Sequence, residues 1–405
     1  MAETALLSLE AALGQLLATA SPLPVEQASL ADAFGRFLAE AVVARVSQPP
    51  ADVSAMDGYA LRFADLQQPL RIVGESAAGR GFAGVVGAGE AVRIFTGAPI
   101  PAGADTVAVQ EDAVQEDAAA DGLVVIARDG PQRAGAHIRR AGLDFRAGGQ
   151  VAQRGDRLTP ARLGLLAAAG HAMLPVVRRP RVALIATGDE LVLPGCVPGP
   201  DQIVSSNGPM LAALLRREGA DVQDLGIVAD TSDALATAFV AAQDADIIVT
   251  IGGASVGDHD LVKPVLQSLG ARLDFWRIAI RPGKPMLAGR LGDAQVIGLP
   301  GNPVSAFVCA TLFLLPLLRH MAGDPNPVSQ PVMARASVGL KANGARRDFM
   351  RATLARDAEG ALWATPCTLQ DSSMLGVLAG ADALLIRPEN DPARAAGATV
   401  PVLTL

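Results

Sequence analysis

The chain is predicted to be a multidomain α/β protein whose central domain has three layers, with helices on both faces of a mainly parallel sheet. Three observations predict this. From Arg181 onward, apolar strands alternate with helical segments. Those strands are apolar along their whole length, as strands buried on both faces are. The regions before and after consist of short Val- and Ile-containing runs separated by Gly, Pro and Asp, which is typical of β domains.

The N-terminal part is predicted to combine a helical linking region with a small β domain. Leucines at helical spacing predict a helix over residues 5–18, and short apolar runs predict β structure from 46 to 140. A further helix is expected after Thr159, which suits an N-cap, with Pro160 at its first position and Gly170 as its stop.

The central domain is expected to repeat the strand and helix unit four times. Strands are expected in RVALIAT, ADVQDLGIV, ADIIVTIGG and AQVIGLPG, and helices in NGPMLAALLRREG, TSDALATAFVAAQ and LVKPVLQSLG. The apolar run at 307–318 is too short to span a bilayer and contains Pro316, so a buried helix explains it better. The expected parts are 1–45 with 141–177 (helical linking region), 46–140 (β domain), 178–326 (α/β domain) and 327–405 (C-terminal β-barrel-like domain).

Composition excludes several classes of protein. The formal net charge of −7 argues against general nucleic-acid binding but permits a small basic pocket. Three widely spaced cysteines fit a reducing compartment, and no signal peptide is recognised, so we expect a cytoplasmic protein without membrane association. The four histidines are scattered, and no HExxH, GxSxG or Walker A motif is present.

Polar residues gather directly after the predicted strands of the central domain. The four strands are followed by TGDE, AD, GGASVGDHD and LPGNP, which contain Glu190, Asp230 and Asp260. The carboxyl ends of parallel strands share one edge of a sheet, where ligands bind. Each segment alone could be a turn, and Asp230 alone could cap a helix. Four of them at one edge favour a binding site.

Two further features indicate phosphate or oxyanion binding. The loop containing Gly252, Gly253 and Ser255 would expose backbone N–H groups before a helix, although one glycine loop is weak evidence. The segment FWRIAIRPGKP carries Arg277, Arg281 and Lys284, the two arginines pointing to the same side if the segment is extended. The alternative for the segment is a solvated edge strand.

Two motifs in the N-terminal β domain also contain polar residues. SAMDGYA includes Asp57 and the only tyrosine of the chain, and RIFTGA ends a predicted strand with Thr96. Each motif alone would be interpreted as a turn.

Taken together and in order, SAMDGYA, RIFTGAPIP, TGDEL, SNGPML, GGASVGDHD, RIAIRPGKP and LPGNPVSAF resemble the bacterial MoeA family of molybdopterin molybdenumtransferases. The E domain of gephyrin is similar to this family. The resemblance covers residues 5 to 405. It implies four domains and a homodimer whose active cleft lies between the α/β domain of one subunit and the β domain of the other. The implied reaction joins molybdate to adenylylated molybdopterin, with Mg²⁺, and releases AMP.

The resemblance also implies site residues. The matching positions are Asp57, Thr96, Glu190, Asp230, Asp260, Arg277, Arg281, Arg351 and Ser372. Glu190, Asp230 and Asp260 are expected to hold the metal and, with Asp57, to take part in catalysis. The other five, with Lys284 and the glycine loop, are expected to bind substrate. The family often has Lys where this chain has Arg277 and Arg281. Two alternatives remain at this stage: a molybdopterin adenylyltransferase, and a non-catalytic scaffold of the gephyrin type.

Overall fold

The computed structural model describes residues 6–116, 123–126, 130–252 and 261–405. These form two compact units. The first comprises Met1–Glu26, Gly35–Ala39 and Pro175–Leu405, and the second comprises Gln27–Phe34 and Glu40–Leu174. The chain passes between them four times: within β1 (Val25–Ser29), at both ends of the segment Gly35–Ala39, and within β12 (Met173–Val177). Each unit is described separately.

The first unit is built around a six-stranded sheet in the order β16-β13-β17-β21-β20-β18. Neighbours among the first four strands pair in parallel, and β20 pairs antiparallel with both β21 and β18. The strands are β13 (Arg181–Thr187), β16 (Asp221–Val228), β17 (Ile247–Ile251), β18 (Arg272–Arg277), β20 (Pro285–Leu291) and β21 (Ala294–Leu299). The predicted mainly parallel sheet is therefore confirmed, with one antiparallel strand inserted near the edge.

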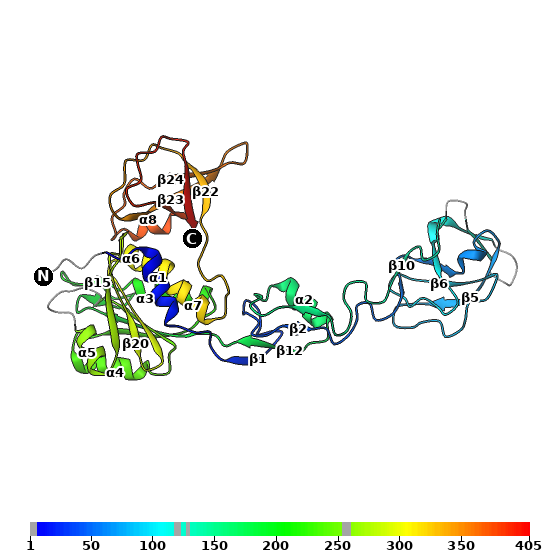
Figure 1. The fold of residues 1–405 in the computed structure, drawn as a ribbon, viewed down its shortest axis with the longest axis horizontal. Coiled ribbons are helices and arrows are strands. Elements are labelled where there is room, and N and C mark those ends of the chain that lie inside the picture. The colour runs from blue at the N-terminus through cyan, green and yellow to red at the C-terminus, as the bar shows by residue number, and fades with distance from the viewer. Residues whose placement is uncertain (1–5, 117–122, 127–129, 253–260) are drawn as a thin grey trace. The chain divides into compact units, whose positions relative to one another are not determined.

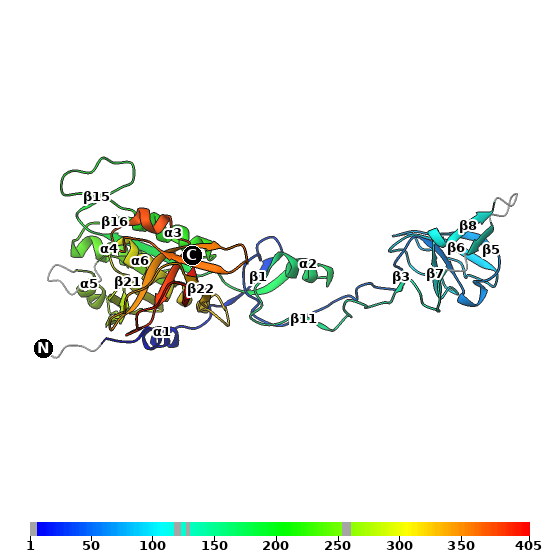
Figure 2. The same ribbon diagram turned by 90° about the horizontal axis from the view of Figure 1, so that it is seen from above.

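Helices cover both faces of this sheet, which confirms the three-layer prediction (Figure 1). One face packs against α4 (Ser232–Ala241) and α5 (Val262–Ser268). The other face packs against α1 (Leu9–Ala18), α3 (Asn207–Arg217), α6 (Pro303–Cys309) and α7 (Leu315–Met321). A short two-strand excursion, β14 (Leu191–Val192) and β15 (Ile203–Val204), extends away from the sheet (Figure 2).

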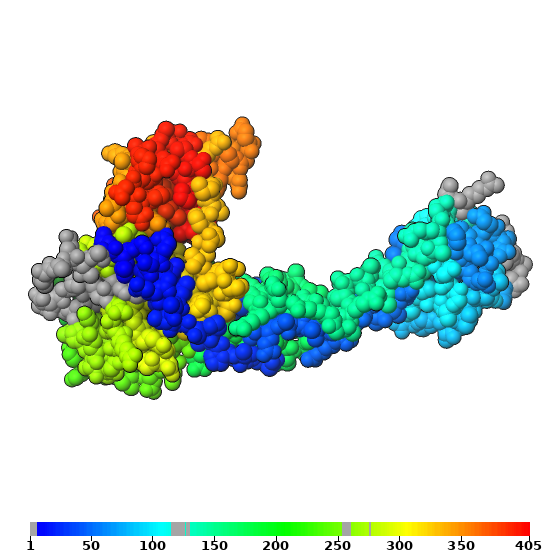
Figure 3. All heavy atoms as spheres, viewed as in Figure 1, coloured from blue at the N-terminus to red at the C-terminus, as the bar shows by residue number. Residues whose placement is uncertain are grey.

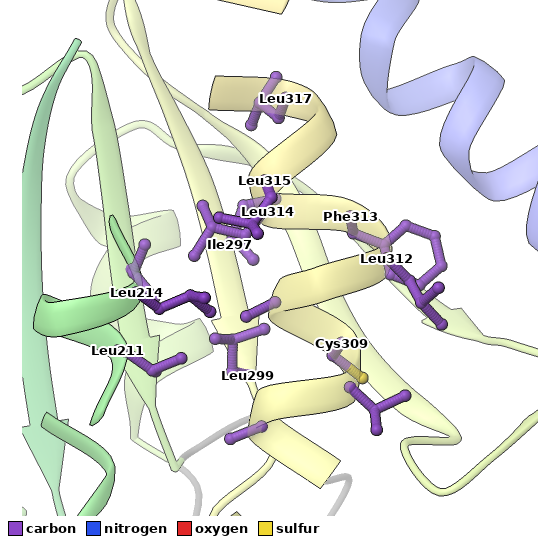
Figure 4. Close-up of a cluster of buried hydrophobic side chains, with 14 of the residues drawn as sticks. Leu211, Leu214, Ile297, Leu299, Cys309, Leu312, Phe313, Leu314, Leu315 and Leu317 are labelled. Carbon is purple, nitrogen blue, oxygen red and sulfur yellow. The ribbon is translucent and has the colours of Figure 1, made fainter. Parts of the chain in front are cut away.

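The most apolar helical run lies in the larger core (Figure 4). Pro303–Met321 is long and apolar enough to cross a membrane, but 78% of its apolar 18-residue window is buried inside the fold, as expected for a core helix. The run is not one uniform α-helix, because Ala310–Leu314 form a π-helical turn between α6 and α7. Pro316 follows this turn and lacks the N–H that a regular helix would use.

The C-terminal part of the first unit is a closed barrel. Strands β23-β24-β22-β26-β25 are hydrogen-bonded in this order, and β25 pairs back with β23. They are β22 (Val332–Ala336), β23 (Arg347–Arg356), β24 (Leu362–Pro366), β25 (Ala383–Arg387) and β26 (Thr399–Thr404), with α8 (Leu375–Ala379) before β25. Helix α1 lies beside the barrel (Figure 3), and its Glu10 pairs with Arg347 at 2.5 Å. The predicted barrel-like domain is confirmed.

The second unit contains a six-stranded sheet in the order β7-β4-β6-β5-β9-β8 and a helical region. Its sheet strands are β4 (Gly58–Leu61), β5 (Leu70–Ser76), β6 (Glu90–Ile94), β7 (Thr106–Val109), β8 (Ala113–Glu116) and β9 (Leu123–Ile126). Shorter strands are β2 (Val42–Val43), β3 (Val53–Ser54), β10 (Ile138–Arg139) and β11 (Gln150–Ala152). Helix α2 (Pro160–Ala168) begins with Thr159 as N-cap, as the sequence predicts.

The segment FWRIAIRPGKP is not a single extended strand. Arg277 ends β18 in the α/β sheet, whereas Arg281 belongs to β19 (Ile280–Arg281), which pairs with β23 of the barrel. The expectation that the two arginines point to the same side of one strand is wrong, because the strand partners of β18 and β19 belong to different sheets.

Candidate functional site

The polar segments of the central domain do meet at one edge of the sheet. The paired registers place Thr187 beside Val228, Ala186 beside Ile251 and Ile251 beside Leu299, so these strand ends are level. Because β18 and β21 are both antiparallel to β20, β18 runs in the same direction as β21. Its last residue, Arg277, and Lys284, which precedes β20, therefore belong to the same edge.

A pocket of about 590 Å³ lies at this edge. Its lining comes from the ends of β13 and β17, the β14–β15 excursion, the start of α3, the loop between β21 and α6, and the residues at the start of α8. The lining residues are Ala186, Thr187, Glu190, Leu191, Ile203, Val204, Ser205, Ser206, Asn207, Ile251, Gly252, Gly301, Asn302, Pro303, Ser373 and Leu375. Hydroxyl, amide and carboxylate groups thus surround a space large enough for an organic ligand.

Two predicted carboxylates belong to this edge. Glu190 lines the pocket. Asp230 follows the neighbouring strand, and its Oδ1 accepts a hydrogen bond from the Thr187 hydroxyl. The backbone N–H of Asp230 donates to Asp189 at 3.3 Å. Asp230 is therefore held by contacts between strand ends, while Thr231, not Asp230, caps α4 through the N–H of Ala234. The reading of Asp230 as the helix cap is wrong.

The three predicted cations differ in their surroundings. Within the part of the chain that the structure describes, Arg277 and Lys284 have no ion-pair partner. Arg281 forms an ion pair with Asp348 of β23. The hydrogen bond to Asp348 raises the pKa of Arg281 above its usual value, so the guanidinium stays charged. Its side chain is 54% exposed, which leaves donor groups accessible.

Arg351 and Ser372 are joined through one loop. Arg351 is buried, and its guanidinium donates to the carbonyls of Leu369 and Asp371 at 3.2 and 2.9 Å. Burial lowers the pKa of Arg351. The next carbonyl, that of Ser372, accepts from the N–H of Val304 in the first turn of α6 at 3.0 Å. Arg351 therefore fixes the loop that brings barrel residues to the start of α6.

Asp57 and Thr96 meet in the second unit. Oδ1 of Asp57 accepts both the backbone N–H and the hydroxyl of Thr96, at 2.7 and 2.8 Å. These hydrogen bonds, the backbone one first, lower the pKa of Asp57. Nearby, Arg93 lies over the rings of Tyr59 and Phe95, with its guanidinium carbon 5.2 and 5.0 Å from their centroids. The two motifs, separate in sequence, form one cluster that keeps a carboxylate ionised.

Three predicted residues, Gly253, Ser255 and Asp260, lie outside the described residues. Over the described ranges, no group of three His, Cys, Asp or Glu side chains is close enough to hold a metal ion. The predicted metal set would need Asp260 in addition to Glu190 and Asp230, so it stays a prediction.

Comparisons with known proteins agree with this architecture along the chain. Residues 7–170 match the MoeA N-terminal region (domain I and II), residues 183–320 a probable molybdopterin binding domain, and residues 333–405 the MoeA C-terminal region (domain IV). The molybdopterin molybdenumtransferase of Haemophilus influenzae is 36% identical over 385 residues, 94% of each chain. That of Synechococcus elongatus is 37% identical, covering 99% of this chain and 100% of the relative. The chain belongs to the molybdopterin molybdenumtransferase family.

A solved structure of this family has the same fold. The molybdopterin biosynthesis MoeA protein of Pyrococcus horikoshii OT3 superimposes with a TM-score of 0.82 at 27% identity, covering 99% of this chain and 100% of that one. The predicted family, fold class and enzymatic role in molybdenum cofactor biosynthesis are thus confirmed.

Several pocket residues of this molybdenumtransferase were not predicted individually. Thr187, Asn207, Asn302 and Ser373 line the pocket, yet none was assigned a role from the sequence. A signal was present for three of them, because Thr187 lies in TGDEL, Asn207 in SNGPML and Asn302 in LPGNPVSAF, all recognised as family motifs. No comparable signal marked Ser373, which reaches the pocket through the loop that Arg351 holds.

Proposed function

We propose that this molybdenumtransferase takes adenylylated molybdopterin and molybdate and releases AMP and molybdenum cofactor. The observation that carries the proposal is the pocket of about 590 Å³ at the strand ends, with two cations at the same edge, Arg277 and Lys284, that have no ion-pair partner among the described residues. Such a pocket suits a ligand with an organic body and a pyrophosphate. The names of the relatives support molybdopterin and molybdenum as the substrate classes.

Different residues of the site would bind different parts of the substrates. Arg277, Lys284 and the backbone at Gly252 would bind phosphate oxygens, because cations and N–H donors match their charge. Arg281, with part of its guanidinium accessible, would bind an oxyanion such as molybdate. Arg351 and Ser372 would also bind the substrate oxyanion. Cleavage breaks the phosphoanhydride, and the AMP phosphorus receives an oxygen from water or from molybdate.

We also propose that Glu190 and Asp230, with Asp260, hold Mg²⁺. The donor set fits, since Mg²⁺ takes carboxylate oxygens and Oδ2 of Asp230 has no partner among the described residues. Mg²⁺ there would neutralise phosphate charge. Without it, carboxylates beside a pyrophosphate would repel the substrate.

A homodimer with shared sites is part of the same proposal. Its support is that the polar cluster of Asp57 and Thr96 belongs to the second unit, whereas the phosphate-binding edge belongs to the first. The division into four domains and the cytoplasmic location predicted from the sequence remain predictions.

The test is AMP release from adenylylated molybdopterin with and without molybdate. Release that depends on molybdate, together with formation of molybdenum cofactor, is the expected result. Arg277→Ala should weaken substrate binding, and Arg272→Ala, an exposed arginine at the opposite end of β18, serves as the charge-matched control. Release that proceeds equally without molybdate would contradict the proposed reaction.

A further inference from the structure

Among the described residues, only one of the two polar atoms of the Asn207 side-chain amide has a hydrogen-bond partner. Its Nδ2 donates to the carbonyl oxygen of Gly301 at 2.6 Å. Its Oδ1 is buried and has no hydrogen-bond partner among the described residues. The orientation is fixed by this geometry, because exchanging the two amide atoms would place two acceptors 2.6 Å apart.

A buried acceptor without a partner is uncommon in folded proteins. Five buried side-chain polar atoms without a partner occur among the described residues: the donors Arg36 Nε and Arg351 Nε, the hydroxyl oxygens Thr250 Oγ1 and Ser337 Oγ, and the acceptor Asn207 Oδ1. Of these, Asn207 alone belongs to a residue that lines the pocket at the strand ends. The missing donor can therefore come from a bound ligand.

The neighbourhood of Asn207 supports this interpretation. Asn207 is the first residue of α3, follows Ser205 and Ser206, and is tied to the loop that precedes α6 through Gly301. Ser205, Ser206, Gly301 and Asn302 line the same pocket. The bond to Gly301 thus holds the amide at the junction of two pocket-forming segments, which limits how far Oδ1 can turn to find another donor.

We propose that Oδ1 of Asn207 accepts a hydrogen bond from an N–H or O–H group of the substrate and that Asn207 is a specificity-determining residue. The inference rests on the proposed function. An adenylylated pterin offers such donors in both halves: the adenine amino group and ribose hydroxyls in one, and the pterin amino and ring N–H groups in the other. A site that hydrogen-bonds a substrate group discriminates against analogues that lack it.

The experiment pairs ligand changes with a protein change. Binding of AMP, purine ribonucleoside 5′-monophosphate, 2′-deoxy-AMP and 3′-deoxy-AMP is measured by calorimetry on the full chain and on Asn207→Ala. If the donor lies in the nucleotide half, one analogue binds the wild type about tenfold more weakly than AMP does. The same analogue and AMP bind Asn207→Ala equally, because the acceptor is gone.

Asn207→Asp tests whether the bond to Gly301 positions the acceptor. It keeps an acceptor oxygen but sets a second acceptor against the Gly301 carbonyl, so its side chain should turn away and discrimination against the donor-lacking analogue should fall. Thr250→Val is the matched control, because it removes another unpaired buried oxygen outside the pocket lining and should leave every affinity unchanged. Melting temperatures are recorded for all variants.

The second arm tests the pterin half. If no nucleotide analogue discriminates, Asn207→Ala should raise the KM for adenylylated molybdopterin about tenfold while its affinity for AMP stays unchanged. Absence of discrimination in the first arm together with an unchanged KM in the second overturns the proposal. Failure of the wild type both to bind AMP and to release it with molybdate would instead refute the proposed function.

Discussion

Replacing Arg281 by alanine should affect stability as well as oxyanion binding. The Asp348 side chain is only 12% exposed, and Arg281 is its one ion-pair partner in the described part of the chain. Loss of the guanidinium leaves a mostly buried carboxylate unpaired, which costs about 1–3 kcal/mol. The direct attraction adds little, about 0–1 kcal/mol, because Arg281 is half exposed and screened by water.

A destabilisation of about 2 kcal/mol corresponds to a fall in Tm of roughly 4–8 °C for a cooperative unit of 150–250 residues. Asp348→Asn alone should cost less, within about 1 kcal/mol, because the remaining arginine faces solvent. The double variant Arg281→Ala/Asp348→Asn should regain most of the stability lost in Arg281→Ala, since no buried charge is then left unpaired. A double-mutant cycle measures this coupling.

The assay combines calorimetric unfolding of the four proteins with titration of molybdate. Both variants that lack Arg281 should bind molybdate about 10- to 150-fold more weakly, equivalent to about 1.5–3 kcal/mol for a charge-assisted contact. In the double variant the Tm would thus recover while the affinity for molybdate stayed low. Equal melting temperatures for Arg281→Ala and the double variant would refute the reasoning about Asp348. Recovery of molybdate affinity in the double variant would refute the binding role of Arg281.

Further predictions concern Asp57, the two described carboxylates at the sheet edge and a buried cysteine. Asp57→Ala should lower AMP release while the Tm stays near normal, and mixed dimers with Asp230→Ala chains should regain activity if sites are shared; inactive mixed dimers would contradict sharing. Because the pKa of Asp57 is lowered, its carboxylate should stay ionised as the pH falls to the usual aspartate pKa of about 3.9, so a pH profile of turnover should show no loss from this group above that pH. Glu190→Gln and Asp230→Asn should slow turnover most at limiting Mg²⁺, with near-normal melting; wild-type rates across the Mg²⁺ series would leave both residues a structural role. Burial raises the pKa of Cys309 to about 12, so iodoacetamide should label exposed Cys196 in the folded protein and Cys309 only after unfolding, as peptide mass spectrometry would show.

The location of the site was predictable because it depends on local patterns. Apolar runs gave the strands, and Gly, Asp and hydroxyl residues after each run marked the strand ends. The parallel pairing of β13, β16, β17 and β21 then places those ends at one edge, as the general rule for such sheets requires. The capping of α2 by Thr159 was equally local.

Contacts between distant residues were not predictable from local patterns. Arg281 and Asp348 are 67 residues apart, and their pairing depends on β19 joining the barrel rather than continuing β18. The same holds for Asn207 and Gly301, which are 94 residues apart. Sequence patterns identify which residues follow strands, but they do not show which side chains satisfy one another.

Arg351 shows how such distant contacts determine the role of a residue. Its guanidinium is buried and binds the carbonyls of Leu369 and Asp371, so an arginine expected to bind substrate is also the support of a loop. That loop places the Ser372 carbonyl on the first turn of α6 and Ser373 in the pocket. Both bonds to the loop come from Nη2, and Nε of Arg351 has no partner among the described residues, so the guanidinium keeps donors that the loop does not use. A lysine ammonium could donate to both carbonyls, but it lacks the planar guanidinium that can donate to the loop and to a ligand at the same time. Arg351→Lys should therefore lower turnover more than it lowers the Tm. If Arg351 only supported the loop, the substitution would lower both to a similar degree.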